Sequence, residues 1–352
     1  MCDDTSLKTK GLIGLANRGN TCFFNSALQL LSHIPELTTY FLNNEFISDL
    51  NNRLIELNNE KNDQLILTKD YAKLIKILWT NSTTVEPKTL HQTIQRIDNR
   101  FNGFEQHDSQ EILSLIIDHI HDGIKYDVEI SYGGIVKNPL DQIMTESTES
   151  WKTLMNNKYS IIADLFYGQY INQIKSLESP DNPLLSKTFE FFSCLTIPIY
   201  GKTLYDCLSH NFQKEILDTK YLYEKTNTRV KAYRQQKLMK IPKYLIITLK
   251  RYKATRNGDS SKCSNLISFP FDDLDLSSYA EGYDKIECKL KLISIGCHSG
   301  GINGGHYYSV CKHINGNWYE YNDETVSEYN IEDEKKTLFK EGYILIYQRI
   351  NE

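Results

Sequence analysis

Apolar residues recur three or four positions apart through the first half of the chain, which is the spacing of one helix face. The clearest such segments are Phe24–Leu31, Tyr71–Leu78 and Leu113–Ile120. Pro35 closes the first segment, and Asp108 or Ser109 precedes the third as its N-cap. The pattern therefore predicts a helical first half.

The second half changes to short apolar segments rich in β-branched and aromatic residues, which are typical of strands. They are Tyr244–Leu249, Lys289–Ile295, His306–Cys311, Asn317–Tyr321 and Gly342–Tyr347. Two polar segments, 176–186 and 254–262, are predicted to be exposed loops. Because helices come first and strands later, we expect an α+β fold rather than a doubly wound sheet.

Composition narrows the class of protein. The 352 residues are 40% hydrophobic and carry a net charge of -5, which suits one large or two medium globular domains and does not indicate a nucleic-acid partner. We find neither a secretory signal nor an apolar run of about 18 residues, so we expect no membrane segment and an intracellular protein. The eight cysteines are scattered and form no CxxC pair, unlike a disulfide framework or a zinc ribbon.

Cys22 lies where the polar turn 17–21 meets the first helical segment. Only a thiolate is nucleophilic, and a helix N-terminus or an imidazolium lowers the thiol pKa from about 8.5. His306 follows a glycine-rich stretch and is a candidate base, while Asn322 and Asp323 could accept from its second ring nitrogen. Taken singly, Cys22 also fits a buried core thiol, His306 fits a histidine beside a hairpin turn, and Asn322 with Asp323 fits a polar turn without chemistry.

Together these segments resemble the ubiquitin-specific proteases, a family of papain-like deubiquitinating cysteine proteases. The resemblance covers about residues 11–349 and rests on separated blocks in the family's order. The block GLANRGNTCFFNSALQ, residues 14–29, resembles the family's cysteine box. It implies that Cys22 is the nucleophile and Asn17 an oxyanion-hole donor, while Asn20 and Thr21 shape the turn.

Three later blocks carry the other implied site residues. FEQHDSQE (104–111) resembles the segment that holds ubiquitin's extended C-terminal tail, and CHSGGINGGHYY (297–308) resembles the histidine box, with His306 as the base. WYEYND (318–323) carries Asn322 as the third triad member, followed by Asp323 as a further catalytic-site residue. The implied tail-binding residues are Gln106, Asp108, Gln110, His298, Gly305 and Tyr307.

The chain departs from the family at two places. Many relatives bind structural zinc through two CxxC pairs in a fingers subdomain, but the corresponding stretches here, Gln173–Ser176 and Tyr223–Thr226, contain no cysteine. We therefore expect no metal and no cofactor, and fingers held by packing and sheet pairing. Asn322 stands where aspartate is commoner, so it can accept from His306 but does not stabilise an imidazolium by charge.

The resemblance implies a papain-like fold with a loose tail at 1–10 and one catalytic domain at 11–350. Its parts would be a helical thumb (about 11–165), a reduced, zinc-free fingers region (about 166–240) and a β-rich palm (about 241–350). The implied activity is hydrolysis of isopeptide or peptide bonds after ubiquitin's C-terminal glycine through a Cys thioester, by a monomer in the cytoplasm or nucleus. Two alternatives remain: a protease for another ubiquitin-like modifier, and a catalytically weak ubiquitin-binding scaffold.

Overall fold

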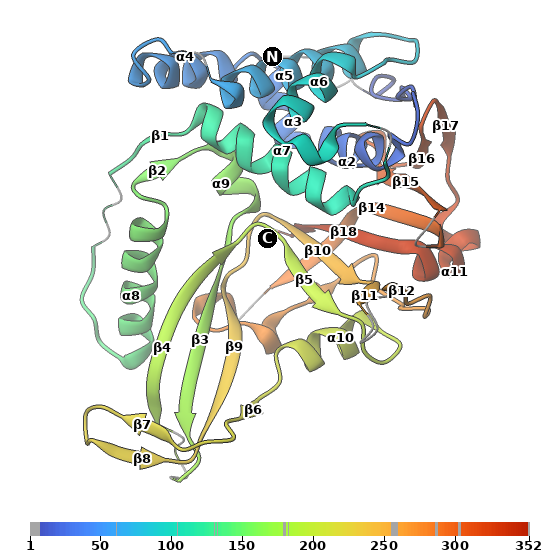
Figure 1. Cartoon of the computed structure of the whole chain (residues 1–352). Coiled ribbons are helices and arrows are strands. Elements are labelled where there is room, and N and C mark those ends of the chain that lie inside the picture. Colours follow the sequence, from blue (N-terminus) through green and yellow to red (C-terminus); the bar gives the residue numbers. More distant parts are fainter. Residues whose placement is uncertain are drawn as a thin grey trace.

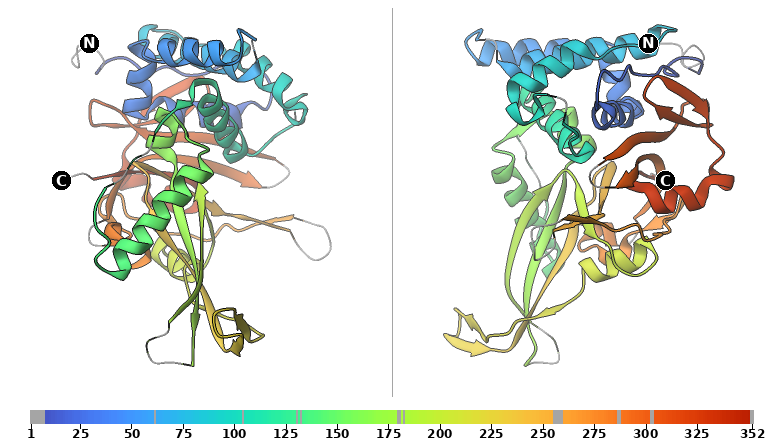
Figure 2. Two further views of the ribbon diagram at one scale, coloured as in Figure 1. Left: turned by 90° about the vertical axis from the view of Figure 1, so that its left-hand side faces the viewer. Right: turned by 45° about the vertical axis from the view of Figure 1, so that its right-hand side comes forward.

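The computed structural model describes residues 8–350 apart from 61, 104, 130, 132, 179, 180, 182, 255–259, 286, 287, 302 and 303. Helices gather at one end, a sheet lies beside them, and long strands reach away to the far end (Figures 1 and 2). Of the expected tail, residues 1–7 lie outside the described part. Lys10 does not belong to a loose tail, because its carbonyl oxygen accepts a hydrogen bond from His313 Nε2 at 2.6 Å.

The helical end confirms the predicted helices. Its elements are α2 (Cys22–Ser32), α3 (Pro35–Leu42), α4 (Phe46–Glu56), α5 (Asp63–Thr80), α6 (Lys88–Ile97), α7 (Ser109–Ile124) and α9 (Ile161–Phe166), with a 3-10 turn at Asn99–Phe101. Helix α8 (Pro139–Leu154) lies apart from them, beside the long strands that reach to the far end (Figure 1). The chain leaves α2 at Ser32 and starts α3 at Pro35, a position where proline's missing N–H costs no hydrogen bond. Asp108 is the N-cap of α7, accepting from the Gln110 N–H at 2.8 Å.

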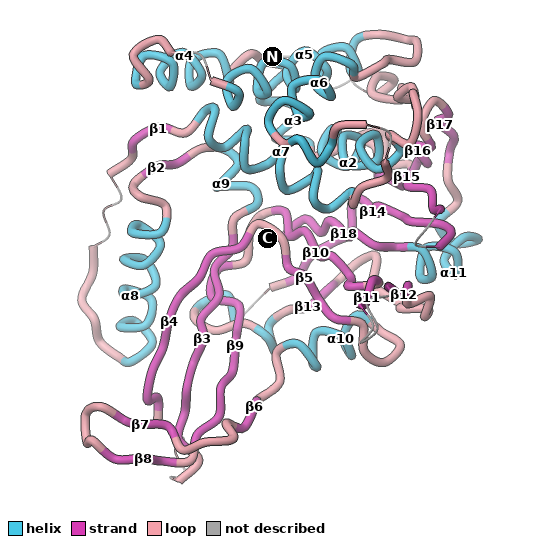
Figure 3. Tube along the Cα trace, viewed as in Figure 1, coloured by secondary structure: helices cyan, strands magenta, loops and turns pink. Residues whose placement is uncertain are grey.

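The main sheet contains all the strands that the sequence predicted (Figure 3). Its order is β17-β16-β15-β14-β18-β10-β5, with β13 beside β14. The bounds are β5 (Leu195–Pro198), β10 (Tyr244–Lys250), β13 (Leu274–Asp275), β14 (Lys289–Gly301), β15 (Gly304–Lys312), β16 (Trp318–Asn322), β17 (Thr325–Glu328) and β18 (Gly342–Arg349). One face of this sheet packs on the helical end, and the other forms a second core with α10 (Leu204–Asn211) and α11 (Ile331–Glu341). Strand β10 is therefore buried on both sides, which explains why its sequence is a continuous apolar run.

Helices α10 (Leu204–Asn211) and α11 (Ile331–Glu341) correct the expectation of a second half made of strands. Helix α10 has eight residues, too few for a helical spacing of apolar residues to be recognised, so the sequence feature that marks it is its N-terminal cap. Thr203 and Asp206 form a capping box, each side chain accepting from the other's backbone N–H. The mixed α+β fold is confirmed despite this difference.

A second, four-stranded sheet reaches away from the core with the order β4-β3-β9-β6. Its strands are β3 (Gly168–Ser176), β4 (Leu184–Phe192), β6 (Glu215–Ile216) and β9 (Ala232–Lys240), and the hairpin of β7 (Tyr221–Tyr223) and β8 (Thr228–Val230) lies at its far end (Figure 1). The stretch Gln173–Ser176 is the end of β3, where it pairs with β9. Just beyond it, the Leu177 N–H donates to the Lys231 carbonyl at 2.8 Å. Sheet pairing therefore continues to the tip of these strands.

Smaller elements complete the description. The pair β1 (Tyr126–Asp127) and β2 (Lys158–Tyr159) flanks α8, and β11 (Tyr252–Ala254) pairs with β12 (Ser260–Lys262). The expected loop 254–262 is thus framed by a short hairpin, and its positions 255–259 lie outside the described residues. In the described part of the chain, no group of three or more His, Cys, Asp or Glu side chains is placed to hold a metal ion. Among the same residues, no helix has the length and apolarity needed to cross a bilayer.

Candidate active site

Cys22 is the first residue of α2, the helix at the centre of the helical end. The turn before it needs left-handed backbone, which Gly19 (φ 114°) and Asn20 (φ 52°) supply. Thr21 is the N-cap, and its carbonyl oxygen accepts from the Asn25 N–H at 3.0 Å. The sequence prediction that Cys22 lies in the first turn is confirmed, so the thiol lies in the positive field of a helix N-terminus.

His306 lies near the start of β15, and Asn322 ends the neighbouring strand β16. The imidazole Nε2 is 2.6 Å from Asn322 Oδ1. The Asn322 Nδ2 donates to Glu320 Oε1 at 3.3 Å, which orients the amide with its oxygen toward the ring. Because that oxygen can only accept, His306 carries a proton on Nε2, which leaves Nδ1 for its hydrogen bond with Cys22.

The pKa of His306 is raised to about 9, chiefly by its hydrogen bond with Cys22. Burial of the ring opposes this rise, while Asn322 and the charge of Asp323 support it. The Asp323 carboxylate is 3.8 Å from Nε2, so an acidic group lies near the ring although the third position is an amide. The site therefore favours an imidazolium at neutral pH, which is the partner that a thiolate needs.

Asp323 joins the turn before α2 to the end of β16. Its two carboxylate oxygens accept from Asn17 Nδ2 and Asn25 Nδ2, each at 2.8 Å, and its carbonyl oxygen accepts from the Leu15 N–H at 2.7 Å. Asn17 Oδ1 in turn accepts from the Gly19 N–H (3.0 Å) and the Thr21 N–H (3.1 Å). These bonds fix the Asn17 amide beside the start of α2.

Asn25 is a site residue that the sequence reasoning missed. All of α2 is buried, yet Asn25, Ser26 and Gln29 are polar. The Ser26 hydroxyl donates to the Tyr308 carbonyl at 3.2 Å and Gln29 Nε2 donates to the Ile13 carbonyl at 2.8 Å. A polar stripe on an otherwise apolar helix is the signal that could have found it, because buried polar groups are normally hydrogen-bonded.

Asp108 and Gln110 lie at the start of α7, at the edge of the same region. Besides capping the helix, the Asp108 carboxylate accepts from Tyr343 Oη at 2.5 Å. Burial raises the Asp108 pKa, and these two hydrogen bonds oppose the rise. Gln110 Nε2 donates to Ser114 Oγ at 3.1 Å, one turn along the helix. The structure thus brings Asp108, but not the Gln110 amide, into contact with the main sheet.

Gln106 bridges the helical end and the β14–β15 hairpin. Its Nε2 donates to the Gly305 carbonyl at 2.7 Å, and its Oε1 accepts from the Gly305 N–H at 3.3 Å. A Cβ at Gly305 would stand 2.0 Å from His298 Nε2, so only glycine fits there. Gly305 therefore lets the Gln106 side chain bond its backbone on one side and the His298 ring lie close on another, directly beside His306.

His298 and Tyr307 form the floor beneath this glycine, with their ring centroids 4.4 Å apart. Burial lowers the His298 pKa to about 4, so the ring is neutral, and its Nδ1 is hydrogen-bonded to Tyr252 Oη at 2.6 Å. Tyr252 and Tyr343, which the sequence reasoning did not single out, thus support the predicted residues from behind. In the sequence, Tyr343 stood within the predicted strand Gly342–Tyr347, and nothing marked either tyrosine hydroxyl as part of the site.

The assembled group is a nucleophile at a helix N-terminus, a positioned imidazole, an amide that orients it, and an amide donor beside the thiol. This arrangement has the parts of a cysteine-dependent acyl-transfer site. Gln106, Gly305 and Asp108 form an edge of hydrogen-bonding groups next to it. Such an edge suits an extended peptide, whose N–H and C=O groups need partners when buried.

A family model described as "Ubiquitin carboxyl-terminal hydrolase" matches residues 13–347. The chain is 33% identical over 351 residues to "Ubiquitin carboxyl-terminal hydrolase Usp2" of Drosophila melanogaster, covering 97% of this chain and 35% of that protein. It is 32% identical over 356 residues to "Ubiquitin carboxyl-terminal hydrolase 2" of Gallus gallus, covering 98% and 95%. Against "Ubiquitin carboxyl-terminal hydrolase 2" of Homo sapiens, at 31% identity, it covers 97% of this chain and 56% of that protein.

Some of these relatives are much longer, and the chain spans about a third of the fly protein and just over half of the human one. Among solved structures, the fold is similar to the one described as "Structure of the SAGA Ubp8/Sgf11/Sus1/Sgf73 DUB module bound to ubiquitin aldehyde". That match has a TM-score of 0.71 and 26% identity, and covers 98% of this chain and 71% of that one. With the family model spanning nearly the whole chain, the protein belongs to the ubiquitin-specific protease family.

Proposed function

We propose that this chain is a deubiquitinase, a thiol protease that hydrolyses the bond after the C-terminal glycine of ubiquitin. The observation that carries the proposal is the contact of His306 with both Cys22 and Asn322 at the N-terminus of α2. Family membership supplies the substrate class, and a neighbouring structure was solved with ubiquitin aldehyde. The bond cleaved would be an isopeptide bond to a lysine or a linear peptide bond.

In the first step, the Cys22 thiolate attacks the glycine carbonyl carbon. The negative charge moves to the carbonyl oxygen, where the Cys22 backbone N–H and the free Nδ2 hydrogen of Asn17 can donate to it. Asn17 is preorganised for this role, because its other Nδ2 hydrogen and its Oδ1 are already engaged. Preorganised donors of this kind cost no reorientation when the charge develops.

In the second step, the His306 imidazolium gives its Nδ1 proton to the leaving amine, and a thioester on Cys22 remains. The neutral ring then takes a proton from water, which attacks the thioester and releases the ubiquitin carboxylate. Asn322 holds the Nε2–H tautomer throughout, and Asp323 supplies the nearby negative charge that an amide lacks. Asp323 also positions Asn17, so we propose it as a positioning residue for both halves of the site.

The diglycine end of ubiquitin would lie between the Asp108 segment and the β14–β15 hairpin. Gln106 and Gly305 then exchange their mutual hydrogen bonds for bonds to the tail, while His298 and Tyr307 line its floor. We retain the division into a thumb (about 11–165), fingers (about 166–240) and palm (about 241–350) as a proposal. The long sheet of β3, β4 and β9 would support the globular part of ubiquitin.

The first test is reaction with ubiquitin that carries an electrophile at its C-terminus, read by intact mass. We expect a single adduct on the wild-type protein, its loss in Cys22→Ala, and slow formation in His306→Ala. Adduct formation that persists in Cys22→Ala would contradict the assigned nucleophile. As a matched control, Cys263→Ala removes a half-buried free thiol and should leave adduct formation intact.

The same experiment separates the alternatives. A protein that binds ubiquitin without an adduct is a scaffold, whereas one that reacts only with another diglycine-tailed modifier is a protease for that modifier. We further propose a monomer located in the cytoplasm or nucleus. All described cysteines are free thiols, which supports a reducing compartment.

A further inference from the structure

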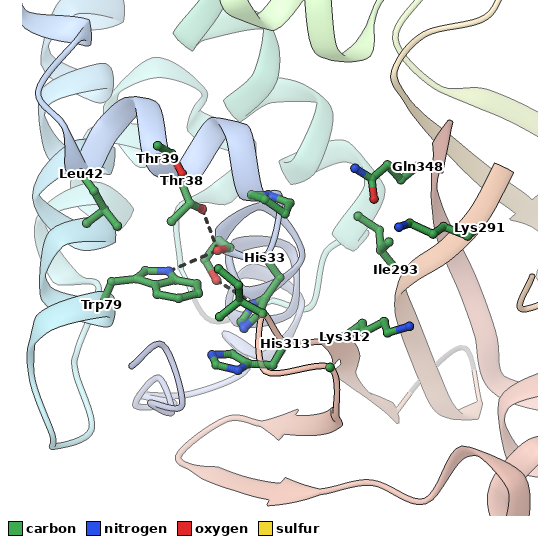
Figure 4. A pocket seen from close by; sticks show the side chains of 14 residues that line it. His33, Thr38, Thr39, Leu42, Trp79, Lys291, Ile293, Lys312, His313 and Gln348 are labelled. Atoms are coloured by element: carbon green, nitrogen blue, oxygen red, sulfur yellow. Dashed lines mark hydrogen bonds between the residues drawn. The ribbon is translucent and has the colours of Figure 1, made fainter. Parts of the chain in front are cut away.

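A pocket of about 250 Å³ lies at the end of α2 that is remote from Cys22. The eleven residues of α2 place it about 15 Å along the helix from the thiol. It opens between α3 and α5 on one side and β14, β15 and β18 on the other, with His33 between them (Figure 4). The site described above does not use it.

The walls of the pocket are held by hydrogen bonds and stacking. The Ser32 carbonyl, at the end of α2, accepts from Thr38 Oγ1 at 2.7 Å and from Trp79 Nε1 at 3.2 Å (Figure 4). The Trp79 ring stacks on His313 at a centroid distance of 5.6 Å and an interplanar angle of 11°. His313 is itself anchored to the Lys10 carbonyl. The pocket is therefore largely formed before any ligand enters.

Much of the lining is apolar surface. Leu42, Ile293 and Ile314 line it together with the Trp79 indole. Burial lowers the His33 pKa to about 4, so this ring is neutral and contributes no charge.

Two cations line the same pocket. Lys291 extends from β14, on the same strand face as Ile293, and Lys312 ends β15. Neither lysine forms an ion pair with a carboxylate of the described residues, and no Asp or Glu of that part of the chain lines the pocket. An apolar cavity with two unpaired cations at its wall has the charge pattern of a site for an amphipathic anion.

We propose that this pocket binds a small carboxylate with an aromatic body, the ring lying against Trp79 and the carboxylate between Lys291 and Lys312. The size supports this class, because most drug-sized sites have volumes of about 300–1,000 Å³ and this one fits a smaller molecule. A ligand here touches elements of both the helical end and the main sheet. Because it binds only the folded state, it stabilises that state by RT ln(1 + [L]/Kd), an amount that rises with ligand concentration.

The test uses 4-phenylbutyrate as the probe and 4-phenylbutanol as its uncharged match. We measure the shift of tryptophan fluorescence and of the melting temperature against probe concentration. For a ligand of this size we expect saturable binding with a dissociation constant on the order of 1 mM. The alcohol should bind about 5-fold more weakly than the acid. Equal binding of acid and alcohol would overturn the proposal, and so would the absence of saturable binding.

Variants locate the site. Lys291→Met with Lys312→Met keeps the apolar stems and should weaken the acid by about 5-fold or more without affecting the alcohol. Thr39→Phe, at an exposed rim position, should block both probes by filling the pocket. Lys336→Met with Lys340→Met, which replaces two exposed lysines on α11, is the charge-matched control and should bind like the wild type. Unchanged binding in both pocket variants would place the probe elsewhere and overturn the proposal.

Discussion

Replacing Asn17 with alanine tests the assigned oxyanion hole most directly. The Asn17 amide has two Nδ2 hydrogens, of which one is bound by Asp323 at 2.8 Å, so a single donor remains for the substrate. Removing one preorganised donor of this kind typically lowers kcat by about 10²–10³, or about 2.7–4 kcal/mol. KM should change little, because the donor acts on charge that develops only in the transition state. The prediction is therefore a loss in kcat at nearly constant KM.

The assay is steady-state hydrolysis of ubiquitin carrying a C-terminal aminocoumarin. Asn17 also accepts hydrogen bonds from the Gly19 N–H and the Thr21 N–H, so its loss could loosen the turn before Cys22. The rate of Cys22 alkylation by iodoacetamide controls for this, because alkylation needs the thiolate but no oxyanion donor. We expect that rate to stay within about threefold of the wild type. A kcat within tenfold of the wild type, or a parallel loss of alkylation, would refute the reasoning.

Three further predictions follow from the site and the fold. The His306 pKa is raised to about 9, so the proton needed by the leaving amine is present below that pH, and kcat/KM should fall as pH rises through about 9. In Asn322→Asp the added carboxylate should raise the His306 pKa further and move this fall to higher pH. An unchanged pH profile in that variant would contradict the prediction. Gly14→Ala should lower the free energy of unfolding by about 1–3 kcal/mol in urea titrations, because its Cβ would stand 2.3 Å from the Glu324 carbonyl oxygen, whereas Gly133→Ala meets nothing within 4 Å and should be neutral. Treatment with EDTA should leave activity and melting temperature unchanged, because the described residues hold no metal-binding group, and a loss restored by zinc would show that reasoning to be wrong.

Local features were readable from the sequence because the signals that report them are local. The helical spacing after Cys22, the strand-forming residues before Cys311 and the glycine-rich stretch before His306 each concern a few neighbouring residues. They predicted α2 and β15, and with the family resemblance they named the triad residues that the structure brings together. The long strands β3 and β9 escaped because their sequences, GQYINQIKS and AYRQQKLMK, are rich in polar residues and lack the apolar pattern of a buried strand.

The supporting contacts needed the tertiary structure. Asn25 and Asp323 are separated by 298 positions, and Asp108 and Tyr343 by 235, yet each pair is hydrogen-bonded. Nothing in the local pattern around any of these residues indicates its partner, because a hydrogen bond depends on where the folded chain brings two groups and not on their neighbours. The sequence by itself therefore determined the helices and strands that carry the site, α2 and β15 among them, and the chemical groups of this protein. Only the packing of helices on the sheet decided which groups meet, in which protonation state, and where an additional pocket opens between them.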